Sequence, residues 1–144
     1  MKNMKIKVKE VTTKKELREF VHFPNELYKD NPYYVPQIES MDRDTLTPSK
    51  NHAFEVCEGK YWLAYDEQDK IVGRVAGIIN HRYNEKVGEK ICRFGWIDFI
   101  DNRDVSEALI LFPFGWYHML KALKKNDTID LLLIAIDEHY QKRV

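Results

Sequence analysis

Apolar and polar residues alternate along several short stretches of this chain, and that alternation is the period of a β-strand with one solvated face. Residues 4–11 alternate apolar side chains with lysines. Residues 60–66 and 70–80 are rich in aromatic and β-branched side chains, and the few residues between them are polar. This pair therefore predicts an antiparallel hairpin. Residues 91–100 predict a further strand.

The predicted hairpin is expected to supply part of the hydrophobic core. Gly73 and Gly77 lie inside its second strand and indicate either a bulge or a close approach of another part of the backbone. The side chains that we expect to be buried, either themselves or through their immediate neighbours, are Trp62, Ala64, Val72 and Val75.

Helical signals follow the first predicted strand. Thr13 and Glu16 have the spacing of a capping box, so a helix is predicted to begin near residue 14. Pro24 then either ends that helix or opens a second, short one. Residues 31–36 contain two prolines and predict an extended aromatic loop. Residues 41–51 are polar and predict a loop with at most one helical turn.

The last third of the chain has a different pattern. A helix is predicted to begin at residues 105–109, with Asp104 as its cap. Residues 110–116 are apolar but contain helix breakers, and residues 117–125 predict a second, short amphipathic helix. Residues 131–136 are apolar without alternation, which is typical of a strand buried on both faces.

Composition indicates a folded globular domain and argues against a disordered or a nucleic-acid-binding protein. The chain has 144 residues, enough for one domain with a core, and its 12% aromatic content and zero formal net charge are unlike those of a disordered protein. A neutral chain gives no electrostatic reason to expect nucleic acid as a partner. We interpret the lysines of residues 4–11 as the solvated face of a strand.

The cysteines and the apolar stretches bear on location. Cys57 and Cys92 form no metal or redox motif and cannot form a disulfide framework, so both are interpreted as small hydrophobic residues in a reducing compartment. The first ten residues lack the apolar segment of a secretory signal. Residues 108–120 are too short and too interrupted to cross a membrane. A cytoplasmic location and no membrane partner are expected.

Most motifs that carry chemistry are absent from the sequence. It contains no zinc-ligand spacing, nucleotide-binding loop or hydrolase nucleophile motif, and its five histidines are scattered, so no metal site is predicted. Two acidic pairs could act as paired carboxylates, but turn and cap duty is the preferred interpretation of both. These pairs are Asp42 with Asp44, and Asp98 with Asp101.

One segment, residues 131–141, is a buried strand followed by a polar turn and a glutamine. It resembles the main motif of the GNAT acyltransferase superfamily, in which a central strand leads to a loop that opens a helix. The resemblance implies acetyl-CoA, or another acyl-CoA, as the cosubstrate: the strand pairs with the pantetheine arm, and backbone N–H groups of the loop hold the pyrophosphate. The implied cofactor-binding residues are Ile134, Ala135, Ile136, Gln141, Lys142, Arg143 and Val144.

The segment also departs from the family pattern. Val144 stands where the family has glycine, and a β-branched side chain is poorly suited to a turn with positive φ or to close approach of a phosphate. The chain then stops where the loop should be completed. We therefore expect the chain to bind acetyl-CoA weakly or not at all, and its activity to be impaired.

The rest of the chain also resembles this superfamily, in two separate parts. A strand, two helices, a loop and a hairpin are the order expected for the first half of a GNAT domain, and residues 61–65 and 71–74 look like its second and third strands. Residues 94–100 and 112–117 resemble segments of longer, little-characterised bacterial GNAT-like proteins. The expected fold class is α+β, with a GNAT-like, mostly antiparallel sheet that is flanked by helices and incomplete at the C-terminus.

An internal repetition predicts where the two parts meet. A central strand followed by an acidic turn occurs at residues 94–104 and again at residues 129–141, whereas one GNAT core needs that element once. Residues 1–109 are therefore predicted to be an N-terminal GNAT-like region. Residues 110–144 are predicted to be a fragment of a later region, and the chain to be an internally shortened form of a longer protein.

The resemblance implies an N-acyltransferase that transfers an acyl group from acyl-CoA to an amine acceptor. Asp98 and Asp130 are weak candidates for the base, structural roles being favoured for both, and no catalytic residue is predicted firmly. The alternative is a non-catalytic GNAT-like remnant or interaction module. Residues 131–136 are expected to mediate self-association unless the apolar strand is covered within the chain.

Overall fold

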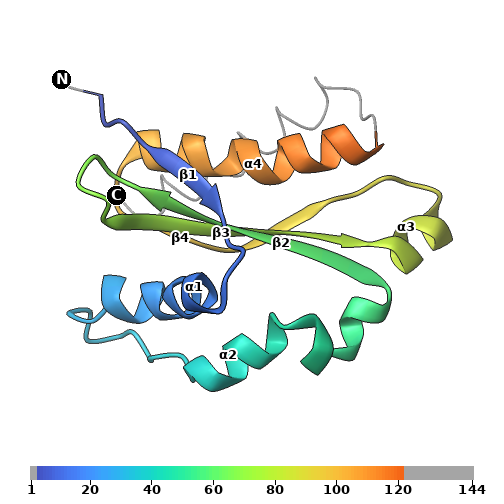
Figure 1. Ribbon diagram of the computed structural model, residues 1–144, viewed down its shortest axis with the longest axis horizontal. Helices are drawn as coiled ribbons and strands as arrows, with labels where there is room; N and C mark the ends of the chain where they lie inside the picture. The colour runs from blue at the N-terminus through green and yellow to red at the C-terminus, as the bar shows by residue number, and fades with distance from the viewer. Residues whose placement is uncertain (1–2, 122–144) are drawn as a thin grey trace.

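The computed structural model describes residues 3–121 of the chain. They form an α+β fold in which a four-stranded antiparallel sheet lies between helices (Figure 1). The strands are β1 (Lys7–Glu10), β2 (Cys57–Tyr65), β3 (Ile71–Asn80) and β4 (Arg93–Phe99). The helices are α1 (Lys14–Leu27), α2 (Glu39–Thr45), α3 (His81–Val87) and α4 (Arg103–Lys121), with short 3-10 turns at Pro48–Lys50 and His52–Glu55.

The strands are ordered β1-β2-β3-β4 in the sheet, and each pair of neighbours is antiparallel. The predicted hairpin is confirmed as β2 and β3. Asp66 closes its turn, because the Oδ1 atom accepts hydrogen bonds from the backbone N–H groups of Gln68 (2.9 Å) and Lys70 (3.0 Å). The burial expected for Trp62, Ala64, Val72 and Val75 is also confirmed.

Helix α4 covers one face of the sheet, while α1 and α2 cover the other (Figure 1). The glycines of β3 allow α4 to lie close to the strand. A Cβ atom on Gly73 would lie 2.7 Å from Cδ1 of Leu109, and one on Gly77 would lie 3.1 Å from Cβ of Pro113. Close approach of α4 is therefore observed at both glycines, and the register between β2 and β3 also shifts next to Gly73, so both predicted explanations apply to this strand.

The opposite face of the sheet packs against α1. Its buried cluster contains Phe20 and Val21 from the helix and Leu63 and Ala76 from the sheet. The capping box that predicted the start of α1 is confirmed: the Glu16 amide donates to the Thr13 hydroxyl at 3.1 Å. The same helix carries the polar residues of the candidate site described below.

The effect of Pro24 differs from both predicted alternatives. Helix α1 neither ends nor restarts at Pro24 but continues through it to Leu27. Proline has no N–H group to donate to the carbonyl four residues earlier, which is that of Phe20. The guanidinium of Arg74 takes the place of that donor, because its Nη1 atom lies 3.0 Å from the Phe20 carbonyl oxygen. A tertiary contact thus compensates for the local cost of the proline.

Three other sequence predictions need correction. Residues 41–51 are more helical than expected, since α2 already begins at Glu39 and a 3-10 turn follows it. Helix α4 begins at Arg103, two residues before the predicted start. Its first amides, those of residues 104 and 105, donate to the side chain of Asn102, whereas Asp104 accepts a hydrogen bond from the Met4 amide.

Helix α4 is also continuous where two separate elements were expected. The described helix runs from Arg103 to Lys121 through Pro113 and Gly115, and up to Trp116 its apolar face packs on the sheet, with Val105, Leu109 and Trp116 in the core. The boundary predicted between residues 109 and 110 falls inside this helix. Residues 122–144, which include the predicted strand 131–136, the base candidate Asp130 and every implied cofactor-binding residue from Ile134 to Val144, lie outside the described residues.

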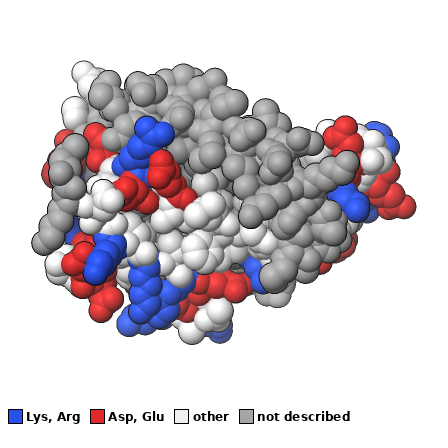
Figure 2. Space-filling model, turned by 90° about the horizontal axis from the view of Figure 1, so that it is seen from above, with Lys and Arg blue, Asp and Glu red and all other residues white. Residues whose placement is uncertain are grey.

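The surface of the described residues carries both charge signs. On the face seen from the side of α4, basic and acidic side chains lie next to one another where residues are described, without a large patch of one sign (Figure 2). Within residues 3–121, no helix is long and apolar enough to cross a bilayer.

Candidate ligand-binding site

A cavity of about 320 Å³ opens between helix α1, helix α2 and the β3–β4 edge of the sheet. We call it the Arg74 cavity. One wall is residues 31–38, an extended segment that joins α1 to α2 and that we call the strap. The residues lining the cavity are Pro24, Tyr28, Tyr34, Gln37, Asp42, Arg74, Trp96 and Asp98.

Arg74 forms the floor of the cavity and is only 5% exposed. Its Nε and Nη2 atoms donate to Oδ2 of Asp98 at 3.0 and 2.9 Å. The other oxygen of that carboxylate, Oδ1, accepts a hydrogen bond of 2.8 Å from the Tyr28 hydroxyl. The guanidinium carbon also lies 5.0 Å from the ring centroid of Phe20 and 5.6 Å from that of Trp96. These contacts fix the position of the buried ion pair.

Trp96 reaches the cavity from a bulge in strand β4. Arg74 pairs with Asp98 and Ala76 with Gly95, so two residues of β4 lie opposite the single residue between them on β3. Trp96 is one of those two, and its φ of 50° is in the left-handed region, which a bulky residue rarely adopts. Bulges of this kind redirect side chains next to functional sites, and here the bulge directs an indole toward Arg74.

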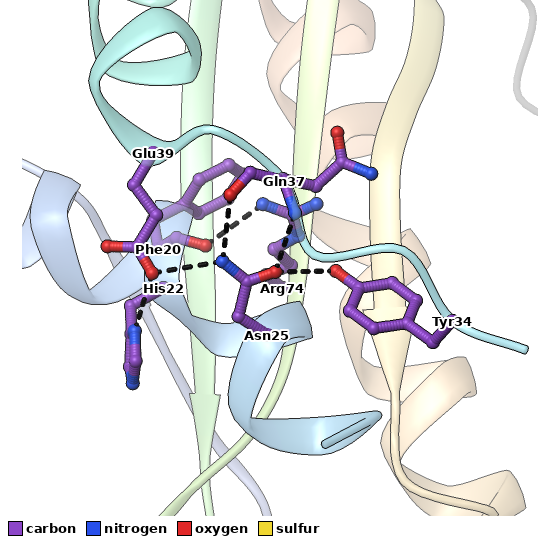
Figure 3. Close-up of polar contacts among 7 residues, drawn as sticks. All are labelled: Phe20, His22, Asn25, Tyr34, Gln37, Glu39 and Arg74. Atoms are coloured by element: carbon purple, nitrogen blue, oxygen red, sulfur yellow. Dashed lines mark hydrogen bonds and ion pairs between the residues drawn. The ribbon is translucent and has the colours of Figure 1, made fainter. Parts of the chain in front are cut away.

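The side chain of Asn25 holds the strap against helix α1 (Figure 3). Its Oδ1 atom accepts hydrogen bonds from the Tyr34 hydroxyl (2.7 Å) and from the Gln37 amide (2.9 Å). Its Nδ2 atom donates to the Gln37 carbonyl (3.2 Å) and to Oε1 of Glu39 (3.0 Å). One side chain therefore positions two of the residues that line the cavity.

His22 and Glu39 extend this network away from the cavity. Nδ1 of His22 lies 2.7 Å from Oε1 of Glu39, the same oxygen that accepts from Asn25 (Figure 3). The hydrogen bond from His22, followed by that from Asn25, lowers the pKa of Glu39. The carboxylate thus stays ionised and anchors the start of α2 to helix α1.

Asp42, in helix α2, contributes a carboxylate to the lining of the cavity. Its side chain is half-buried, and its Oδ2 atom is shielded from solvent and accepts no hydrogen bond from any residue in the described part of the chain. A buried polar atom without a partner costs on the order of 1–3 kcal/mol. Asp42 therefore lines the cavity and keeps one shielded oxygen atom that has no hydrogen-bond partner among residues 3–121.

The charges that line the cavity do not balance. Two carboxylates, Asp42 and Asp98, lie there with one guanidinium, that of Arg74. Burial, followed by the charge of Asp98, raises the pKa of Tyr34, so its hydroxyl remains neutral. The electrostatics of this site therefore favour a cation over an anion.

Members of the two acidic pairs that the sequence singled out lie in different environments in the structure. Turn and cap duty is wrong for Asp98, which lies within β4 and pairs with Arg74 across the sheet. Asp44 is on the surface, where its Oδ1 atom lies 3.1 Å from the Lys50 ammonium. Asp42 and Asp98, taken from different predicted pairs, line one cavity.

Sequence reasoning did not select the other residues of the cavity. Arg74 had a signal that could have found it, because it is the single charged residue inside the apolar run of residues 71–79. Two aromatic side chains of the cavity, Tyr28 and Tyr34, lie at either end of the Asn31-Pro32 turn. Trp96 gave no such signal, since the bulge that redirects it depends on pairing with β3.

The cysteines lie apart from this cavity. Both are half-buried free thiols. Burial raises the pKa of the Cys92 thiol to about 11, which makes it a poor nucleophile near neutral pH. No cluster of three or more potential metal ligands occurs among residues 3–121.

Comparison with known proteins adds one relative. The chain is 30% identical over 124 residues to Protein YghO of Escherichia coli (strain K12). The matched region covers 86% of this chain and 31% of that protein, so the chain spans about a third of the length of the relative. No family model matches the sequence, and no solved structure matches it.

Proposed function

We propose that this chain is part of a GNAT-type N-acyltransferase, and that its described residues form the side of the site that binds the amine acceptor. The sequence resemblance described above is the first support. The second is the order of the first elements, because a strand, two helices and a hairpin follow one another as that resemblance implies. Helices on both faces of an antiparallel sheet agree with the same architecture.

The observation that carries the proposal is the acidic excess of the Arg74 cavity. An acyl-CoA carries phosphates, which a cavity with two carboxylates and one guanidinium disfavours. An amine acceptor is an ammonium ion near neutral pH, and the same cavity favours it. Three aromatic side chains in the lining, Tyr28, Tyr34 and Trp96, add faces that attract a cation.

The described residues do not provide a pyrophosphate loop. The β4–α4 junction is a strand followed by a helix, but Asn102 already accepts the first amides of that helix, and Asp104 adds a negative charge there. A bound acyl-CoA would supply an activated thioester. The residues implied for binding it, from Ile134 to Val144, lie outside the described part of the chain.

The described residues can bind the acceptor and take up its proton. An ammonium must lose a proton before its nitrogen can attack a carbonyl, and a carboxylate or a water that it holds can accept that proton. Both oxygens of Asp98 are engaged by Arg74 and Tyr28, which makes Asp98 a structural group. The Oδ2 atom of Asp42 has no hydrogen-bond partner among residues 3–121, so Asp42 is the carboxylate that we propose as the proton acceptor.

An assay of acyl transfer tests the proposed function. The chain is mixed with millimolar acetyl-CoA and a panel of primary amines, and release of free CoA is followed with a thiol reagent. We expect slow release that saturates with amine, together with weak binding of acetyl-CoA in a parallel calorimetric titration, because Val144 stands in place of glycine. Release that does not depend on the amine would overturn the proposal.

The alternative, a non-catalytic interaction module, is favoured by one observation. The strap and the start of α2 expose large apolar side chains, with Tyr33 at 91% exposure. Such a strip is typical of an interaction surface. The others that it exposes are Val35, Ile38 and Met41. If amines bind to the chain but no acyl transfer occurs at any acetyl-CoA concentration, this alternative is the better account.

A further inference from the structure

The unpartnered oxygen of Asp42 narrows the class of ligand that the Arg74 cavity can take. We infer that the cavity binds a primary ammonium group that donates an N–H hydrogen bond to Asp42, attached to an apolar body that contacts Tyr28, Tyr34 and Trp96. Its role as acyl acceptor rests on the proposed function, whereas the binding itself does not.

The choice of Asp42 over Asp98 follows from their hydrogen bonds. Arg74 already neutralises Asp98, and Tyr28 occupies its other oxygen. No cation of the described part forms an ion pair with Asp42. Rotation about the Cβ–Cγ bond is soft in aspartate, so a small rotation can turn the shielded oxygen toward a ligand in the cavity. A charge-assisted hydrogen bond would then replace the missing partner.

The aromatic walls supply the second part of the recognition. The rings of Tyr28 and Tyr34 lie 5.0 Å apart between centroids and are tilted by 45°. Their hydroxyl groups are engaged elsewhere, by Asp98 and by Asn25, so their rings are held in place from both ends. Rings fixed in this way contact the apolar body of a ligand at little entropic cost.

The size of the cavity sets the size of that body. A volume of about 320 Å³ is at the low end of ligand pockets and far exceeds the space that an ammonium group alone needs. A ring or a short aliphatic chain fills the remainder. An amine with a single aromatic ring is therefore a suitable probe.

An anionic ligand is disfavoured by the charges around Arg74. Three of the five N–H groups of its guanidinium already have acceptors, two of them on Asp98 Oδ2 and one on the Phe20 carbonyl. An entering carboxylate could approach only the remaining N–H groups and would meet the charges of Asp42 and Asp98 in the same cavity. The cavity therefore favours an amine over an acid.

Three probes of equal ring size test the inference by calorimetric titration of the full chain. Benzylammonium can donate N–H hydrogen bonds, benzyltrimethylammonium has the same charge but no N–H, and benzoate has the opposite charge. We expect benzylammonium to bind at least about tenfold more tightly than the quaternary ion, since one charge-assisted hydrogen bond distinguishes them. Benzoate should not bind. Equal or tighter binding of the quaternary ion would show an aromatic cage without Asp42 and would overturn the inference.

A variant assigns the hydrogen bond to its acceptor. Asp42→Asn should weaken benzylammonium binding by about tenfold or more, while the matched variant Asp44→Asn, which alters a surface carboxylate two residues away, should leave it unchanged. Circular dichroism and urea unfolding confirm that each variant is folded, and Asp42→Ser replaces Asp42→Asn if the latter is not. Unchanged binding by the folded variant would contradict the inference. If the chain transfers acyl groups but does not bind benzylammonium through Asp42, the inferred amine site is wrong and the proposed activity stands. If it binds benzylammonium but transfers no acyl group, the proposed activity is wrong and the amine site stands.

Discussion

Nη1 of Arg74 donates a hydrogen bond of 3.0 Å to the carbonyl oxygen of Phe20, 54 residues earlier in the chain. In an unbroken helix that carbonyl would accept from the amide of residue 24, but residue 24 is proline. The proline in α1 and the arginine in β3 therefore depend on each other. Because Arg74 also holds Asp98, the first helix, the third strand and the fourth strand meet at one guanidinium.

Arg74→Met should be among the most destabilising substitutions in the described chain. It leaves the Asp98 carboxylate half-buried without its cation and the Phe20 carbonyl without a donor. The free energy of unfolding should fall by about 3–5 kcal/mol, as it does when one partner of a buried ion pair is removed. Urea unfolding measures it. Lys50→Met, which breaks the exposed pair with Asp44, is the control and should change the free energy little.

The glycines of the sheet offer a matched pair of substitutions. In Gly73→Ala the new methyl group would lie 2.7 Å from Cδ1 of Leu109 and 3.0 Å from Cγ1 of Val105, so these buried side chains or α4 itself must shift. Overpacking of this kind costs about 1–3 kcal/mol. In Gly95→Ala the methyl group meets nothing within 4 Å, so its effect should be small. Thermal unfolding of both variants compares them, and equal melting temperatures would contradict the close packing of α4 on β3.

The left-handed backbone at Trp96 predicts that replacement by glycine destabilises the fold less than replacement by alanine, which reverses the usual order in a strand. In an ordinary strand position, alanine is more stable than glycine by about 0.5–1 kcal/mol. At a φ of 50° the Cβ atom of alanine is strained by about 1–2 kcal/mol, and glycine is not. Both variants lose the indole contact with Arg74, so Trp96→Gly should unfold at a higher urea concentration than Trp96→Ala. If Trp96→Ala instead unfolds at the higher urea concentration, the bulge relaxes when the indole is removed and the prediction is wrong.

Tyr61 predicts how stability depends on alkaline pH. Burial raises the pKa of its hydroxyl from 10.0 to about 12, and the hydroxyl donates to the Leu46 carbonyl at 2.7 Å. Because the pKa is higher in the folded state, the contribution of Tyr61 is complete below pH 10 and is lost as the pH rises toward about 12. In that window the wild type should lose up to about 1.4 kcal/mol per pH unit relative to Tyr61→Phe. Urea unfolding at several pH values measures the difference, and a constant difference would be evidence against the shift.

Elements with strong local signals could be predicted from the sequence. The hairpin and the start of α1 were predicted because alternation and capping are local properties of residues 60–80 and 13–16. The end of α1 and the continuity of α4 could not be predicted, since Pro24 and Pro113 break helices in isolation. In the fold, Arg74 replaces the missing donor at Pro24, and packing on Gly77 accommodates Pro113.

The candidate site was less predictable than the fold. Its residues come from α1, the strap, α2 and two strands, and no spacing in the sequence brings Asp42 near Asp98. Asp98 was selected as a weak base candidate for which a structural role was favoured, and its contacts with Arg74 and Tyr28 agree with that role. Asp42 was interpreted as a turn or cap residue, because the absence of a partner for its oxygen appears only in three dimensions.

A proton–nitrogen correlation spectrum of the tryptophan indoles tests the central claim, that an amine binds in the Arg74 cavity, most directly. The chain has three tryptophans, of which Trp96 lines the cavity, while Trp62 of β2 and Trp116 of α4 pack against each other on the other face of the sheet. Added benzylammonium chloride, compared with sodium chloride at the same concentration, should shift the Trp96 signal in a saturable way and leave the other two in place. An unmoved Trp96 signal at millimolar amine, or equal shifts of all three, would contradict the account.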